Sequence, residues 1–239
     1  MITNSHHLQI ISSLKNTSGL SKPNFIGFGL KYCGTDRPGF HLNTASHKQI
    51  LKDFLKTNKL TNTQLTNLIT SLYTQAISYD EIILAGRLPG YFKNYLSQIN
   101  PKILDIWLEY THGWAEIDTL CQMNFTDLDF LAHWPHWQKI LKKFNQNKNI
   151  SKRRASLVLL TKPVRLSKDP HLSNLAFENI ENLKLEKNIL ITKAVSWILR
   201  SLIKNHSMEV KKYLKDNQDT LPKIAIREAT SKLLTGKKN

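Results

Sequence analysis

Cysteine, glycine and proline are scarce in this sequence, and long apolar runs are missing. Two cysteines, Cys33 and Cys121, are too few for a disulfide framework, so we expect a soluble cytoplasmic protein. With 9 glycines and 8 prolines among 239 residues, a fold of many strands joined by tight turns is not expected. No apolar run approaches the roughly 18–20 residues of a transmembrane helix, and residues 1–7 lack a signal-peptide pattern, so no membrane association is expected.

Negative charge is also scarce and unevenly distributed. The chain has 34 Lys+Arg and 18 Asp+Glu, a formal net charge of +16. Residues 1–119 hold 11 of these cations and 8 of the acids, whereas residues 120–239 hold 23 and 10. Such an excess indicates a polyanionic partner. We expect the C-terminal half to bind most of it.

Apolar residues recur at helical spacing almost throughout, and alternation of period two is nowhere sustained. Asp80 before Glu81 predicts a helix start, Ser151 is a candidate cap for the helix carrying Arg154, and Pro163 predicts the end of that helix. The pattern predicts about ten to twelve helices of about 10–18 residues.

Many similar helices without strands predict an all-α fold. The favoured architecture is an α-solenoid, a superhelix of HEAT-like helix pairs of about 40 residues with a basic concave face, and a globular bundle is the alternative. No linker interrupts the chain, so residues 1–239 are expected to form a single domain. Residues 1–22 are interpreted as a polar lead-in that includes a short helix, and residues 236–239 as a frayed tail.

The segment 113–121 carries the first candidate site. Trp114 and Asp118 are four residues apart, so on a helix they share one face. An aromatic ring face and a carboxylate both attract positive charge, and together in a cleft they favour a cation. The alternative is a tryptophan partly buried in the core and an aspartate that caps a neighbouring helix.

A run of three cations forms the second candidate site. Lys152, Arg153 and Arg154 open an apolar helix and could bind phosphates without sequence preference. The alternative is that Lys152 and Arg153 are simply solvated, whereas Arg154 adjoins the apolar run.

The third candidate site places an aromatic residue between two cations. Lys193, Trp197 and Arg200 fall at helical spacing on one stripe, which favours a surface that meets nucleic acid. As the alternative, Trp197 fills the core.

The final helix has the fourth pattern, in which Lys223 and Arg227 share a face. Glu228 and Lys232 are also four apart, a spacing that supports a helix by ordinary charge pairing.

Signatures of metal or nucleotide cofactors are missing. His133 and His136 lack a second pair of ligands at metal-binding spacing, so no metal is expected. No phosphate-binding glycine loop or serine-hydrolase motif is found, and no cofactor is expected. Cys121 has no evident histidine partner and is interpreted as a packed core thiol.

Taken together, these segments resemble the bacterial DNA alkylation repair glycosylases of the AlkD family. Trp114 with Asp118, Arg154 before an apolar helix, and the run Lys193–Arg200 occur in that family's order and approximate spacing, and Arg227-Glu228-Ala229 is similar to its ending. The resemblance covers roughly residues 25–235 and is clearest from residue 90 onward.

The resemblance implies a HEAT-like superhelix that cradles duplex DNA and hydrolyses the N-glycosidic bond of alkylated purines such as 3-methyladenine and 7-methylguanine, without flipping the base into a pocket. It makes Asp118 the catalytic carboxylate, Trp114 and Trp197 the aromatic walls of the cleft, and Arg154 a DNA contact. Residues expected to contact DNA with it are Arg153, Lys152, Lys193, Arg200, Lys223 and Arg227.

The chemistry agrees with the residues. An N3- or N7-alkylated purine is already cationic and departs as a neutral base, so one carboxylate can suffice where a glycosidase uses two. Asp118 would stabilise the oxocarbenium-like sugar and orient water.

The sequence also departs from the family pattern near its N-terminus. Family members place a tyrosine there that faces the cleft, and here both Phe28 and Tyr32 are candidates. The segment 34–47 also differs from the better-known members.

Two other functions compete with a monomeric alkylpurine glycosylase acting on double-stranded DNA. One is a non-enzymatic HEAT-type nucleic-acid-binding protein, an inactive relative, and the other is an adaptor for acidic proteins. A binder has no use for a carboxylate that faces phosphates, so Asp118 and the two tryptophans distinguish the enzyme from it.

Overall fold

The structure, a computed structural model, describes residues 2–18, 28–92, 94–122 and 125–238, with the side chain of Phe28 outside the description. Within these ranges the chain is helical and contains no β-strand, which confirms the all-α prediction and is consistent with an α-solenoid. Several helices, such as α6, α9 and α12, have only four to six residues and are shorter than predicted.

The helices gather into two compact units, residues 1–124 and residues 125–239, and each is described by itself. No charged residue lies between positions 120 and 124, so unit 1 carries the weakly basic part of the sequence and unit 2 the strongly basic part. The single domain stays a prediction.

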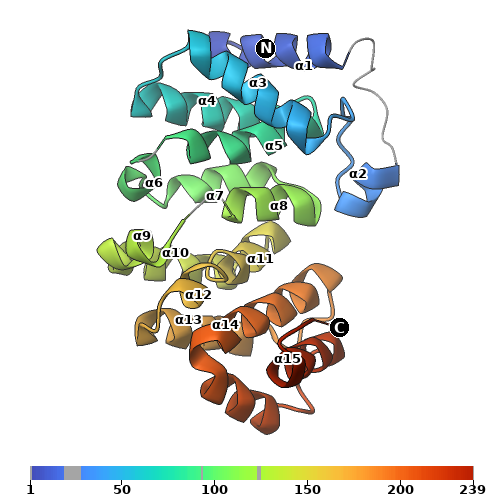
Figure 1. The fold of residues 1–239 in the computed structure, drawn as a ribbon, viewed down its shortest axis with the longest axis vertical. Helices are drawn as coiled ribbons and strands as arrows, with labels where there is room; N and C mark the ends of the chain where they lie inside the picture. The colour runs from blue at the N-terminus through green and yellow to red at the C-terminus, as the bar shows by residue number, and fades with distance from the viewer. Residues whose placement is uncertain (1, 19–27, 93, 123–124, 239) are drawn as a thin grey trace. The chain divides into compact units, whose positions relative to one another are not determined.

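Unit 1 is built from successive layers of paired helices (Figure 1). Helix α1 packs against α3, α4 against α5, and α5 against α8. The elements are α1 (Ser5–Thr17), α2 (Phe28–Cys33), α3 (Thr44–Thr57), α4 (Asn62–Thr74), α5 (Tyr79–Arg87), η1 (Leu88–Tyr91), α6 (Tyr95–Gln98), α7 (Ile103–Trp107), η2 (Leu108–Tyr110) and α8 (Gly113–Cys121).

Helix α1 belongs to the core of unit 1, although it lies in the segment predicted as a lead-in. Ile10 and Leu14 are fully buried, and His7 contacts Ser71 and Glu81 at 2.8 Å and 2.7 Å. The buried histidine and carboxylate satisfy one another. The short helix expected in this segment is therefore packed into the core, which the polar composition did not indicate.

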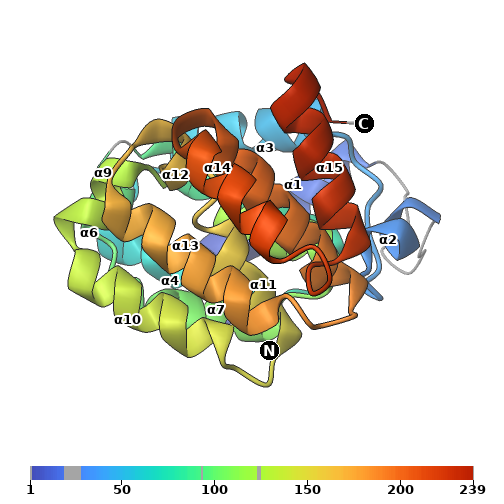
Figure 2. The same ribbon diagram turned by 90° about the horizontal axis from the view of Figure 1, so that it is seen from below.

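Unit 2 is centred on the long helix α14, which packs against α11, α12, α13 and α15. Figure 2 shows α15 beside α14. The elements are α9 (Asp127–Ala132), α10 (Trp134–Asn145), α11 (Ile150–Val158), α12 (Pro163–Leu166), α13 (Pro170–Leu183), α14 (Ile189–Asp216) and α15 (Lys223–Thr235). Helix α14 bends at His206, whose backbone leaves the helical region at φ −132° and ψ 39°.

Aromatic residues fill the first layer of unit 2. Trp137 stacks on Phe130 with ring centroids 4.0 Å apart and meets Phe125 edge-on at 5.0 Å. All three side chains are buried, so Trp137 is core rather than part of a histidine-rich site.

Candidate active-site groove and nucleic-acid interface

Trp114 and Asp118 lie one turn apart on α8, as their spacing predicts. Both side chains are half-buried and line an open hollow of about 570 Å³ in unit 1. Arg87 from the end of α5 and Thr44 from the start of α3 line it as well. The hollow therefore combines an aromatic ring, a carboxylate and a guanidinium within one unit.

Tyr32 is the N-terminal aromatic residue that meets this group. Its ring packs edge-on against the ring of Trp114, with centroids 5.7 Å apart and planes at 78°. The indole Nε1 of Trp114 donates a hydrogen bond of 2.8 Å to the carbonyl oxygen of Tyr32. Tyr32 keeps 66% of its surface exposed, whereas the side chain of the other candidate, Phe28, lies outside the described residues.

Two glycines let the chain after α2 touch the first residue of α8. Gly34 and Gly113 have φ of +78° and +65°, in the left-handed region that disfavours side chains. A Cβ atom on Gly113 would lie 2.2 Å from the carbonyl oxygen of Cys33 and 2.4 Å from the carbonyl carbon of Gly34. This backbone contact places Tyr32 against Trp114.

Glu116 joins the same two segments through buried hydrogen bonds. It is fully buried and accepts hydrogen bonds from the Thr35 hydroxyl at 2.6 Å and the His112 backbone N–H at 2.8 Å, with the Arg37 guanidinium 3.5 Å away. Burial raises the pKa of the Glu116 carboxyl, although the hydrogen bonds from Thr35 and His112 favour its charged form. Sequence reasoning missed this residue, because a carboxylate between Trp114 and Asp118 gives no signal of a partner 81 positions away.

Further contacts fasten the segment after α2 to the loop before α8. Asp36 lies 2.8 Å from His112 Nδ1, and the hydrogen bond from this imidazole lowers the pKa of the Asp36 carboxyl. Arg37 donates to the carbonyl oxygen of Tyr110 at 2.6 Å. The stretch that departs from the family pattern thus holds one wall of the hollow.

In unit 2, two of the three predicted phosphate contacts on α11 are buried. Arg154 is 4% exposed and donates to the carbonyl oxygen of Leu190, at the start of α14, and Lys152 is 7% exposed. The interpretation of Lys152 as a solvated residue is wrong. Both side chains have contacts inside the unit, and their binding to DNA stays a prediction.

Arg153 is also committed to internal contacts. Its guanidinium lies 2.7 Å and 3.2 Å from the two carboxylate oxygens of Glu186 and donates to the carbonyl oxygens of Asn147 and Lys148. A two-pronged pair of this kind positions the arginine firmly. Arg153 joins the loop before α11 to the loop before α14.

The stripe on α14 is accessible. Lys193 is exposed, and Trp197 and Arg200 are half-buried. Arg200 lies 3.3 Å from Glu228 of α15 and 3.3 Å from the Ser196 hydroxyl. The guanidinium is thus held in place beside Trp197.

Glu228 of α15 is an acid that pairs with cations near this stripe, Arg200 and Lys238. It is 4% exposed, accepts a hydrogen bond of 2.5 Å from Ser196 and lies 3.1 Å from the Lys238 ammonium. Burial alone would raise the pKa of its carboxyl, but Ser196, Lys238 and the charge of Arg200 hold that pKa below its ordinary value. Glu228 thus turns toward α14, and Lys238, predicted to fray, is one of its partners.

Further cations lie on α15. Lys223 and Arg227 are exposed on α15. Burial lowers the pKa of the Lys232 ammonium, and the charges of Arg200 and Arg165 lower it further. Cations gathered closely enough to disfavour one another are stabilised by a bound anion.

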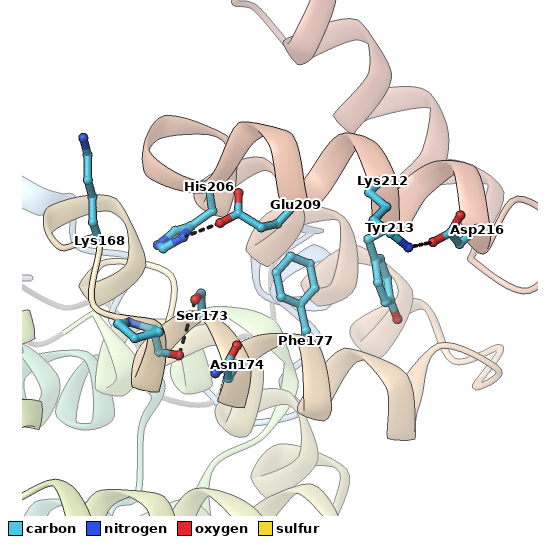
Figure 3. Close-up of a pocket in the computed structure, with 10 residues that line it drawn as sticks. Lys168, Ser173, Asn174, Phe177, His206, Glu209, Lys212, Tyr213 and Asp216 are labelled. Atoms are coloured by element: carbon cyan, nitrogen blue, oxygen red, sulfur yellow. Dashed lines mark hydrogen bonds and ion pairs between the residues drawn. The ribbon is translucent and has the colours of Figure 1, made fainter.

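A separate hollow of about 310 Å³ lies between α13 and the second half of α14 (Figure 3). Two pairs form within the hollow, His206 with Glu209 at 3.6 Å and Lys212 with Asp216, and Lys168 lines it as well. None of the predicted DNA-binding residues lines it. With cations and acids balanced, this hollow offers a polyanion little attraction.

Neither a metal cluster nor a membrane span is found in the described ranges. No group of three or more His, Cys, Asp or Glu side chains there could hold a metal ion. No helix in the same ranges has the length and apolar character needed to cross a bilayer.

Comparisons with known proteins point to one family. A family model described as a DNA alkylation repair enzyme matches residues 20–233. The chain is similar to the solved structure of a predicted DNA alkylation repair enzyme from Enterococcus faecalis, with 17% identity, a TM-score of 0.67, and coverage of 96% of this chain and 95% of that one. At this identity the likeness shows the fold alone. None of the curated proteins compared with the chain matches it.

Proposed function

Because the chain belongs to the DNA alkylation repair enzyme family, we propose that it is a DNA glycosylase for positively charged alkylated purines. Membership supports a role in alkylation repair. The finer proposal is hydrolysis of the N-glycosidic bond of bases of the 3-methyladenine and 7-methylguanine type in double-stranded DNA.

The observation that carries this proposal is the carboxylate of Asp118 beside the ring of Trp114 in an open hollow. In hydrolysis of an N-glycosidic bond the sugar gains positive charge as the base leaves. A carboxylate and an aromatic face both stabilise that charge. A protein that only bound DNA would gain nothing from an acid in its binding groove, because the acid repels phosphates.

In the proposed mechanism Asp118 stabilises the oxocarbenium-like sugar and orients the attacking water. Trp114, held by its hydrogen bond to Tyr32, presents its ring to the cationic nucleotide. The role of Trp197, a residue of unit 2, as a second aromatic wall stays a prediction from the resemblance. The alkylated base departs as a neutral molecule, so no general acid is needed. We propose that the reaction proceeds without flipping the base, since the hollow lies open at the surface of unit 1.

The basic surface of unit 2 is proposed to bind the DNA backbone. Lys193, Lys223 and Arg227 are exposed, and Arg200 is half-buried and accessible, so these four are the first candidates for phosphate contacts. Lys152, Arg153 and Arg154 are proposed to shape this surface through their internal contacts and to bind phosphate secondarily.

The charge of the lesion provides the test. We expect the protein to release 7-methylguanine and 3-methyladenine from duplex DNA at least about 10²-fold faster than uracil or O6-methylguanine, because neutral lesions need a proton that the site does not donate. The measurement is chromatography of released bases under single-turnover conditions. Comparable release of a neutral lesion would show that the site holds a general acid. Binding without release of any base would favour the non-enzymatic alternative.

A further inference from the structure

Unit 1 has two cations in or next to the hollow of Asp118 that the sequence patterns did not single out. Arg87 lines the hollow of Trp114 and Asp118, and it also lines an adjoining hollow of about 490 Å³ together with Lys48 of α3. Arg87 is half-buried and Lys48 is exposed. One guanidinium therefore stands between the carboxylate and a second cation.

Among the described residues, no carboxylate neutralises either of these two cations. Arg87 donates one hydrogen bond of 3.3 Å to the Thr44 hydroxyl, and its Nε is buried with no hydrogen-bond partner in the described part of the chain. Neither Arg87 nor Lys48 forms an ion pair with a carboxylate of the described residues. A guanidinium with spare donors in an open groove is suited to an oxyanion such as phosphate.

A close contact between α5 and α8 lies next to both Arg87 and Asp118. Gly86 lies against Thr119, and a Cβ atom on Gly86 would come within 2.6 Å of the Thr119 methyl and 3.2 Å of its carbonyl oxygen. Arg87 and Asp118 are the immediate neighbours of these two residues. The missing side chain at Gly86 thus brings guanidinium and carboxylate to the same hollow.

We propose that Arg87 and Lys48 bind two backbone phosphates next to the damaged nucleotide, so that unit 1 holds DNA itself. This rests on the proposed function, because every sugar in a DNA strand carries phosphates on both sides. A sugar placed at Asp118 has a phosphate for the guanidinium in the same hollow, and the next phosphate along the strand meets Lys48. Two cations of the weakly basic unit thus lie where the carboxylate would otherwise repel DNA.

The test is the salt dependence of binding to an undamaged duplex. We expect Arg87→Ala and Lys48→Ala each to weaken binding about three- to tenfold. Each should also reduce the magnitude of the negative slope of log K against log salt by about 1, as for one lost phosphate contact. Arg87→Lys, which keeps the charge, should keep the slope. Lys59→Ala is the matched control, because Lys59 is exposed just beyond the far end of α3, about 20 Å from Thr44 at 1.5 Å per residue.

Protection of Cys33 from alkylation tests whether DNA lies in this groove. Cys33 lines the hollow with Arg87, so we expect undamaged duplex to slow its reaction with iodoacetamide, and to slow it less in Arg87→Ala. Slopes for Arg87→Ala and Lys48→Ala equal to that for Lys59→Ala would overturn the proposal, and so would unprotected Cys33. Lys48 is exposed, so its variant answers the question even if Arg87→Ala does not fold. All these readouts use undamaged DNA, so a wild type that releases no base defeats the proposed function without deciding this one.

Discussion

Replacing Asp118 with asparagine is expected to slow base release by about 10²–10³-fold, the usual effect of removing one preorganised electrostatic group. Asparagine keeps the size of the side chain and removes its charge. The side chain is half-buried in the hollow beside Trp114, where an interaction with a cationic sugar is stronger than in bulk water. The measurement is the single-turnover rate of 7-methylguanine release from a duplex.

Two controls address indirect effects of this substitution: the affinity for DNA, and the replacement of a second carboxylate. Affinity for undamaged duplex should stay the same or rise slightly in Asp118→Asn, because one charge that repels phosphates is lost. Asp53→Asn is the matched control, since Asp53 is an exposed carboxylate of the same unit whose pKa is lowered by hydrogen bonds from Lys56 and Gln49. If Asp118→Asn releases base within threefold of the wild type, the role assigned to Asp118 is wrong.

Replacing Gly113 with alanine is expected to destabilise unit 1 by about 2–5 kcal/mol, the sum of a left-handed backbone cost and a steric overlap. The Cβ atom would lie 2.2 Å from the carbonyl oxygen of Cys33, and neither backbone segment can yield without separating. Because Glu116 and Trp114 join the same two segments, the displacement should also loosen the contact between Tyr32 and Trp114. Urea unfolding measures the first effect, and hydrogen exchange in the peptide 113–121 measures the second.

Gly236 provides the control for backbone strain alone. Its φ is +72°, close to that of Gly113, but nothing lies within 4 Å of where its Cβ atom would be. Gly236→Ala should therefore cost only about 1–2 kcal/mol. Equal losses in the two variants would contradict the close contact between α2 and α8.

The helical fold was predictable because burial imposes its period on the sequence. Helix starts were less accurate: Ser78, not Asp80, caps α5, and Asn149, not Ser151, caps α11. Asp80 lies inside the helix, where it accepts hydrogen bonds from the backbone of Phe40 and from His47. A tertiary contact of this kind competes with local capping and leaves no local pattern.

The candidate site was predictable only where its partners share a helix. The spacing of four residues placed Trp114 and Asp118 on one face of α8, and the same rule placed Lys193 and Trp197 on an accessible stripe of α14. Local pattern could not show that Arg154 turns inward to a carbonyl group of another helix.

Long-range contacts account for the rest of the site. Glu116 meets a partner 81 positions away, and Arg87 meets Thr44 at a separation of 43. Such contacts depend on how the helices pack, so no single segment of the sequence reveals them.

Product analysis of a duplex with one 7-methylguanine is the most direct test of the central claim, hydrolysis of the N-glycosidic bond. Mass spectrometry after incubation with the full chain should find free 7-methylguanine and a strand with an abasic site, formed faster than in the absence of protein. A strand in which the methylated base stays attached, or in which guanine is restored with no free base, would contradict the claim.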